Sequence, residues 1–228
     1  HVEGSLDPLR DIEIINTELC LADLESVEKR MERTQKMVKS GDKKAKVEME
    51  LLERIKAVLG EAVPARRVEM NDDERLMIRD LNLLTLKPVL FVANVAEDEV
   101  ATAENDNPYV QKVKAYAKEE GAEVVVVSAK VESEIAELGD EDAKEFLAEL
   151  GLDQSGLDKL IKASFKLLGL ITFLTAGVQE VRAWTITDGT KAPEAGGKIH
   201  SDIERGFIRA EIVSYDDLIA AGSQNAAK

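Results

Sequence analysis

Two short apolar runs, separated by a helix-length segment, constrain the fold of this chain more than any other feature. Residues 89–93 read Val-Leu-Phe-Val-Ala, and residues 124–127 are four consecutive valines. Continuous apolar runs of this length are typical of parallel strands that are covered on both faces. Between them, Asn107-Pro108 predicts the start of a helix and Gly121 its end. The sequence therefore predicts a βαβ unit within an α/β fold.

Each predicted strand ends in a polar loop, Asn94-Val95-Ala96-Glu97 after the first and Ser128-Ala129-Lys130 after the second. The carboxyl ends of neighbouring parallel strands lie at one edge of a sheet, where open α/β sheets bind ligands. The pairing is typical of the base-reading half of a nucleotide-binding domain. Asn and Ser are also ordinary turn formers at strand ends, which is the alternative interpretation. The candidate base-binding residues are Asn94, Val95, Glu97, Ser128, Ala129 and Lys130.

The acidic residue of the first loop bears on which purine would bind. In the guanine-reading version of this motif, an Asp accepts hydrogen bonds from the N1–H and the 2-amino group. Adenine has an acceptor at N1 and donates only through its 6-amino group. Because the longer Glu97 stands in place of that Asp, we expect guanine selection to be lost. The backbone N–H of Ala129 would face the purine 6-substituent and would suit guanine better, so the loops alone leave the base open.

The phosphate-binding parts of a nucleotide site are not recognisable in this chain. The sequence contains no Gly-x-x-x-x-Gly-Lys-Ser/Thr segment, whose backbone would cradle the phosphates. Phosphoryl transfer needs that cradle, a bound metal ion and a positioned water. We therefore assign no catalytic and no metal-binding residue, and expect the chain by itself to be inactive.

A long helical hairpin is predicted before the βαβ unit. Apolar residues between Leu24 and Val38 follow the three-and-four spacing of a coiled coil, and residues 47–59 carry a second such stripe. Ser40-Gly41-Asp42 breaks the helix between them. The expected elements are a helix from Asp7-Pro8, an antiparallel hairpin over about residues 20–62, and a short helix from Asn71 through Leu84.

Charge is distributed unevenly along the chain. The whole sequence carries −15, but residues 29–46 hold eight basic and two acidic residues, a net +6, which leaves −21 for the remainder. A basic spot on an acidic body can approach a polyanion while the rest is held away. The alternative is a solvated helical face. Candidate contacts to RNA or the ribosome are Lys36, Lys39, Lys43, Lys44 and Lys46.

Composition and the remaining segments indicate a globular cytoplasmic protein. No apolar stretch approaches the roughly 20 residues of a membrane span, and residues 1–5 lack the features of a signal peptide. Trp184, His200 and the single Cys20 are expected to be structural. Later helices are expected at Glu132–Leu150 and Leu157–Leu168, and strands at Ile171–Leu174, Val181–Ile186 and Phe207–Val213.

Four segments together resemble the YchF / Obg-like ATPase family, which belongs to the Obg group of P-loop NTPases. They are DIEIINTEL at residues 11–19, LKP at 86–88, NVAE at 94–97 and GFIRAE at 206–211. The similarity covers nearly the whole chain and corresponds to the C-terminal two-thirds of such a protein. It implies ATP preference through the Asn-x-x-Glu motif, with GTP possible and Mg²⁺ in the intact protein.

The resemblance also implies an architecture. Residues 1–84 would be the helix, the inserted coiled-coil hairpin and a short helix. Residues 85–170 would be the C-terminal half of the nucleotide domain, a partial doubly wound parallel sheet. Residues 171–228 would be an incomplete β-grasp (TGS-like) domain, since the family's phosphate loop, switch segments and last strands have no counterpart in this sequence.

Two functional hypotheses follow from different classes of protein. The first is a fragment of a ribosome-associated ATPase, a hydrolase of nucleoside triphosphates when intact, that carries the base-reading loops. The second is an interaction module that docks on RNA or the ribosome through the basic hairpin and the β-grasp region. No membrane partner is expected, and the oligomeric state is open.

Overall fold

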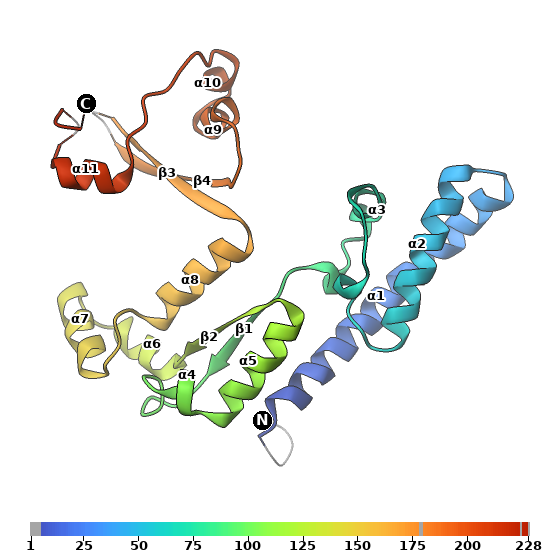
Figure 1. The fold of residues 1–228 in the computed structure, drawn as a ribbon, viewed down its shortest axis with the longest axis horizontal. Coiled ribbons are helices and arrows are strands. Elements are labelled where there is room, and N and C mark those ends of the chain that lie inside the picture. Colours follow the sequence, from blue (N-terminus) through green and yellow to red (C-terminus); the bar gives the residue numbers. More distant parts are fainter. Residues whose placement is uncertain (1–5, 178–179, 224, 228) are drawn as a thin grey trace. The chain divides into compact units, whose positions relative to one another are not determined.

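The computed structural model describes residues 6–177, 180–223 and 225–227. The chain folds into two units, residues 1–167 and residues 168–228 (Figure 1). The first holds a two-stranded parallel sheet and the second a two-stranded antiparallel sheet, so the fold is mixed α/β as predicted. Among the described residues, no helix is long and apolar enough to cross a membrane.

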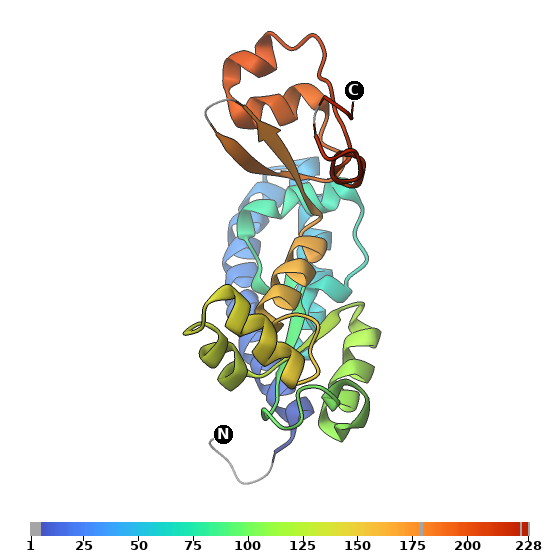
Figure 2. The same cartoon turned by 90° about the vertical axis from the view of Figure 1, so that its left-hand side faces the viewer.

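The first unit opens with two long helices joined by a tight turn. Helix α1 (Pro8–Lys39) begins where Asp7 accepts a hydrogen bond from the backbone N–H of Leu9. Gly41 makes the turn with a φ of +89°, in the left-handed region that favours glycine. Asp42 then caps α2 (Lys43–Gly60), which runs back along α1 in both views (Figures 1 and 2). The helix break thus lies where the sequence predicts it.

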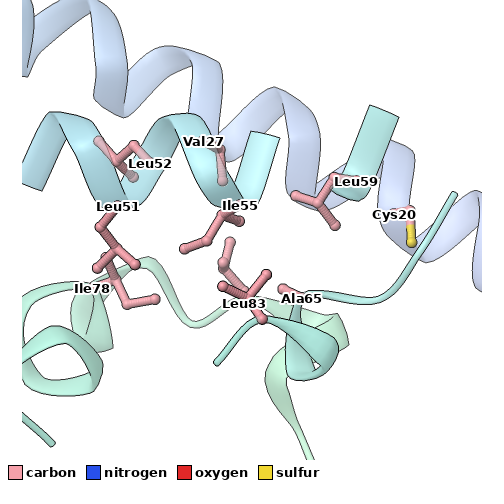
Figure 3. Close-up of a cluster of buried hydrophobic side chains, with 10 residues drawn as sticks. Cys20, Val27, Leu51, Leu52, Ile55, Leu59, Ala65, Ile78 and Leu83 are labelled. Carbon is pink, nitrogen blue, oxygen red and sulfur yellow. The ribbon is translucent and has the colours of Figure 1, made fainter. Parts of the chain in front are cut away.

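The largest apolar core of this unit lies between the hairpin and the segment that follows it (Figure 3). Burial raises the pKa of the Cys20 thiol, and the nearby carboxylate of Asp23 raises it further, so this cysteine is a structural thiol as expected. The buried members of the core are Cys20, Val27, Leu51, Leu52, Ile55, Leu59, Ala65, Val68, Ile78 and Leu83.

A buried carboxylate fixes the chain where it leaves the hairpin. Asp23, which is 3% exposed, accepts hydrogen bonds from the backbone N–H groups of Leu84 (2.8 Å) and Thr85 (2.7 Å). The Thr85 hydroxyl donates to the same carboxylate at 2.6 Å and accepts from the N–H of Ala65 at 3.0 Å. Every polar group in this cluster has a partner, as burial requires.

This anchor explains a wrong prediction, because the expected helix from Asn71 through Leu84 is interrupted. Helix α3 (Asp72–Met77) begins at Asn71 with a capping box, but only two 3₁₀ turns, η2 (Arg79–Leu81) and η3 (Leu84–Leu86), follow it. An earlier 3₁₀ turn, η1 (Ala65–Arg67), precedes it. Asn82 has a φ of +48°, and Asp23 binds the amides that a continuous helix would have used.

The predicted βαβ unit is confirmed. Strand β1 (Leu90–Asn94) pairs in parallel with β2 (Glu123–Val127), in a register that places Asn94 beside Val127. The connection contains α4 (Ala103–Asp106) and α5 (Pro108–Glu120), and α5 begins and ends at the predicted Asn107 and Gly121. Within the described residues β1 pairs only with β2, and Val92 on β1 is 47% exposed.

After β2, the described part of this unit continues with α6 (Ala129–Ile135), α7 (Asp140–Glu149) and α8 (Gly156–Leu167). The single helix predicted over Glu132–Leu150 is therefore wrong. Gly139 is the N-cap of a new helix whose first turn holds three acidic residues, and acidic side chains favour a helix start. The Glu132 side chain accepts hydrogen bonds from the N–H groups of Gly156 and Leu157, which ties α8 to α6.

The described residues of the second unit form a β-hairpin and three short helices. Strands β3 (Leu170–Ala176) and β4 (Val181–Thr187) are antiparallel, with Phe173 beside Trp184. Helices α9 (Ala192–Ile199) and α10 (Ser201–Arg205) lie on one side of this hairpin (Figure 2), and α11 (Tyr215–Ala221) follows. Trp184 is half-buried and donates through Nε1 to the hydroxyl of Thr175 at 2.9 Å. His200 accepts the N–H of Asp202 and caps α10, a structural role.

The strand predicted at Phe207–Val213 does not form among the described residues. The segment has no regular secondary structure, and the sheet contains only β3 and β4. The alternating pattern satisfies the side-chain requirement of a strand, but a strand also needs a neighbouring backbone to bond. Here no described segment supplies it.

Candidate nucleotide-base site and basic surface

The two strand-end loops are joined by a direct hydrogen bond. Asn94, the last residue of β1, accepts through Oδ1 from the backbone N–H of Ala129 at 2.9 Å. The N–H of Val95 donates to the carbonyl of Val127 at 2.9 Å, which continues the ladder one residue beyond the strand. The loops are thus held together before any ligand binds.

A cavity of about 680 Å³ opens beside these loops. Five of the six candidate base-binding residues line it, and the sixth, Ala129, contributes the N–H that Asn94 holds. That bond differs from the expectation that the Ala129 N–H would face a purine. The lining residues are Asn94, Val95, Ala96, Glu97, Asp98, Ser128, Lys130 and Leu150.

Two charged groups that line this cavity, Lys130 and Glu97, are paired with each other. Lys130 donates to the Glu97 carboxylate, and this bond together with the negative charge of Glu97 raises the pKa of Lys130. The positive charge of Lys130 and the negative charge of Glu97 therefore offset each other at the edge of the cavity. Deeper in, the Ser128 hydroxyl is buried and has no hydrogen-bond partner among the described residues. Such a group is ordinarily satisfied by a ligand or by water.

Two further lining residues, Asp98 and Leu150, lie outside the two strand-end loops and were not predicted from the sequence. Asp98 follows Glu97 directly in the sequence, so the pair of adjacent acidic residues is the feature from which its position could have been predicted. Leu150 comes from the end of α7 and gives the cavity an apolar wall. No local pattern marks it, because its position depends on how α7 packs.

The five candidate lysines lie around the tip of the α1–α2 hairpin. All are exposed, and none forms an ion pair with a described residue. By contrast Arg30 from the same basic window binds Glu48 and Asp80, and so serves the hairpin itself. The lysines are Lys36 and Lys39 on α1, and Lys43, Lys44 and Lys46 on α2.

The base of the hairpin is connected to α5 by a buried ion-pair cluster. Glu120 at the end of α5 is bound by Arg66 and Arg67, with Nε–O distances of 2.9 Å for both. Burial by itself would raise the pKa of Glu120, but the hydrogen bonds and charges of the two arginines outweigh it, and the pKa is lowered. One turn earlier, the Tyr116 hydroxyl accepts from the Asn16 amide at 3.0 Å.

Known proteins resemble this chain over its whole length. The "Ribosome-binding ATPase YchF" of Bacillus subtilis (strain 168) is 56% identical over 228 residues, which are all of this chain and 62% of that protein. The protein of that name from Escherichia coli O157:H7 is 49% identical over the same shares. "Obg-like ATPase 1" of Rattus norvegicus is 42% identical over all of this chain and 58% of its own length.

A solved structure and a family model agree with these relatives. The "Structure of the Schizosaccharomyces pombe YchF GTPase" matches 99% of this chain and 61% of that one, with a TM-score of 0.84 and 35% identity. Residues 170–228 match the family model YchF-GTPase_C, described as a protein of unknown function (DUF933). The names of these proteins differ in the nucleotide: the relatives are called ATPases, and the protein of the solved structure is called a GTPase.

The fold and the strand-end loops define the class: a mixed α/β protein with a parallel βαβ unit and a polar cavity at its carboxyl edge. Within that class, the chain belongs to the YchF/Obg-like ATPase family. It spans about 62% of the length of the YchF relatives it matches.

Proposed function

We propose that this chain is part of a cytoplasmic, ribosome-associated YchF-type ATPase and holds the adenine of ATP between its two strand-end loops. The observation that carries the proposal is the cavity of about 680 Å³ at the carboxyl ends of β1 and β2. The relatives named ribosome-binding ATPases, which align with every part of the chain, support the assignment.

The chemistry of the cavity suits adenine. The bond from Ala129 occupies Oδ1 of Asn94 and leaves its amide NH₂ as a donor for a ring nitrogen acceptor. Val95 and Leu150 provide apolar surface for the ring faces. The Glu97 carboxylate, which guanine would need as an acceptor, is engaged by Lys130. The buried Ser128 hydroxyl is a further group that a base could satisfy.

The phosphates and Mg²⁺ would be held by parts of the intact protein with no counterpart in this sequence. Among the described residues β1 has a partner on one edge only, which supports a sheet that continues on the other edge, because parallel strands are ordinarily paired and covered on both sides. A second cavity of about 380 Å³ opens where β1, α5 and the start of α1 meet. The chain would then be the second half of a doubly wound nucleotide domain with an inserted hairpin, followed by an incomplete β-grasp.

Base binding can be tested by NMR on the intact chain. Titration with adenosine or ATP should shift the amide signals of residues 94–98 and 128–130, and guanosine should shift them less. Purified chain should show no steady ATP turnover, since phosphate cradling is missing. Shifts confined to other residues would exclude this cavity as the base site, and clear turnover would contradict the assignment of the phosphate site to another part of the protein.

The second candidate function is docking on the ribosome or RNA through the hairpin tip. It is favoured by the five exposed lysines, Lys36, Lys39, Lys43, Lys44 and Lys46, which no described acidic group neutralises. Because phosphate contacts release counterions, binding through them should weaken steeply as salt is raised.

Charge-reversal variants distinguish binding through the hairpin tip from attraction that depends only on the net charge of the chain. Changing Lys36, Lys39, Lys43 and Lys44 to Glu should abolish co-sedimentation with ribosomes and flatten the salt dependence. The matched control reverses four exposed lysines elsewhere, Lys112, Lys118, Lys144 and Lys198. Equal losses in both variants would mean that net charge, not the hairpin tip, governs binding.

A further inference from the structure

Leu150 reaches the base cavity from an element separate from the two strand-end loops. It caps the C-terminal end of α7, and Gly151, with a φ of +73°, turns the chain away directly after it. Apart from Val95 and Ala96, the other residues that line the cavity are polar or charged. Leu150 is therefore the large apolar side chain that faces the cavity from outside the loops.

Helix α7 does not by itself fix the position of Leu150. None of the side chains of this helix is buried. Within the part of the chain that the structure describes, none of them forms a hydrogen bond or an ion pair. A short helix held only by partly buried apolar contacts is weakly anchored. The position of Leu150 must therefore depend on the segment that follows it.

The segment after Leu150 is held by a carboxylate. Glu132, in the first turn of α6, accepts the backbone N–H of Gly156 at Oε1 (2.7 Å) and that of Leu157 at Oε2 (3.0 Å). Both carboxylate oxygens are thus used at the start of α8. A negative charge is favoured at a helix N-terminus, where free N–H groups and the helix dipole meet it.

The start of α8 also packs directly on the end of β2. A Cβ added at Gly156 would lie 2.9 Å from Cγ1 of Val127, so the backbone of α8 approaches the strand as closely as glycine allows. Ser155 is buried, and its hydroxyl accepts the N–H of Asp158 at 3.0 Å. Only the short link of residues 151–155 separates this fixed point from Leu150. Glu132 therefore ties Leu150 to the strand end that carries the second loop.

We propose that Glu132 is a positioning residue, which holds the start of α8 and thereby keeps Leu150 at the cavity, where Leu150 packs against the ring face of the bound base. This inference rests on the proposed base site and adds to it the contact that sets affinity without choosing the base. Every base has a ring face, so such a contact is indifferent to base identity. The choice between purines stays with the groups that meet the base edge.

NMR titration of the whole chain with adenosine and with guanosine tests the role of Leu150. The Leu150→Ala variant should bind both nucleosides about fivefold to tenfold more weakly, with their affinity ratio unchanged. Leu150→Met conserves the volume of the side chain and should keep most of the affinity. The matched control is Leu138→Ala, because Leu138 is 40% exposed and does not line the cavity.

A double-mutant cycle tests the role of Glu132. Glu132→Gln keeps one carbonyl acceptor but loses the charge, and should weaken both nucleosides about threefold. Because Glu132 acts through Leu150, E132Q should have almost no further effect when combined with L150A. In the protein without nucleoside, the methyl signals of Leu150 should move in E132Q and stay in place in the exposed control Glu137→Gln.

The outcomes separate this inference from the proposed function. If adenosine shifts no signal at residues 94–98 and 128–130 of the wild type, the base site is overturned, and this inference with it. If those shifts appear but L150A binds as the wild type does, or changes the affinity ratio, the base site stands and the inference fails. Additive losses in E132Q/L150A, or unmoved methyl signals in E132Q, overturn the positioning role. Circular dichroism checks folding, and the L150A and L150M titrations still decide if E132Q does not fold.

Discussion

The side-chain oxygen of Asn94 holds the backbone N–H of Ala129 at 2.9 Å, across 35 residues of sequence. Each residue ends or follows a strand of the parallel pair, so the bond locks the geometry of one loop to that of the other. A base bound as proposed would therefore meet a preformed wall, which would reduce the entropic cost of ordering the loops on binding.

Replacing Asn94 with Ala should loosen both loops. The loss of one hydrogen bond costs about 1 kcal/mol of unfolding free energy, and adenosine-induced shifts at residues 128–130 should disappear. Urea unfolding and NMR titration measure the two effects. Asn105→Ala, at an exposed position on α4, is the matched control and should change neither. Retained shifts in N94A would mean that Asn94 does not organise the site.

Shortening Glu97 to Asp should alter purine preference. The shorter side chain cannot reach Lys130 as well and is released to accept from guanine, so the ratio of adenosine to guanosine affinity should fall by about tenfold. Parallel titrations of the chain with the two nucleosides give the ratio. The exposed Glu137→Asp substitution serves as control. An unchanged ratio in E97D would show that base choice lies elsewhere.

Glu120 should make stability depend on acid pH. Its pKa is lowered in the folded protein, so its ion pairs stabilise fully above the ordinary Glu pKa of about 4.3. That contribution is lost as the pH falls through the lowered folded-state value. The Glu120→Gln substitution should cost about 1.5–3 kcal/mol of unfolding free energy at pH 7, because two arginines lose hydrogen bonds to a charged partner. The variant should then lose less further stability in acid than the wild type does. Urea unfolding at several pH values, with the exposed neighbour Glu119→Gln as control, checks both statements.

Gly156 should tolerate no side chain. A Cβ there would lie 2.9 Å from Cγ1 of Val127 and 3.0 Å from a carboxylate oxygen of Glu132, both of which hold the second loop. Gly156→Ala should therefore lower the unfolding free energy by roughly 1–3 kcal/mol through overpacking. At Gly60, the last residue of α2, no atom lies within 4 Å of an added Cβ, so Gly60→Ala should be close to neutral. Equal thermal stability of the two variants would contradict the close approach.

Local sequence patterns predicted the parts of the structure that depend on local chemistry. Asp7, Asp42 and Asn107 cap helices because their side chains bond amides two or three residues away. The loops at Asn94 and Ser128 meet because parallel strands place their carboxyl ends together.

Local patterns gave wrong or no predictions where a contact with a residue far away in the sequence determines the structure. Nothing near Leu84 indicates that Asp23, 61 residues earlier, captures its amide and prevents a longer helix. The same holds for Arg66 and Glu120, which lie 54 residues apart in sequence. For residues 207–213 the local pattern predicts a strand that does not form. Their alternation is strand-like, but no described strand pairs with them.

Helix α1 is continuous over 32 residues and is therefore about 48 Å long at 1.5 Å per residue. Its first turns line the second cavity, of about 380 Å³, together with β1, and its far end carries Lys36 and Lys39. A tilt of about 5° at the base would displace the lysines by about 4 Å over that length. A shift of less than 1 Å at the start of α1, beside β1, would thus move Lys36 and Lys39 by more than the length of a hydrogen bond.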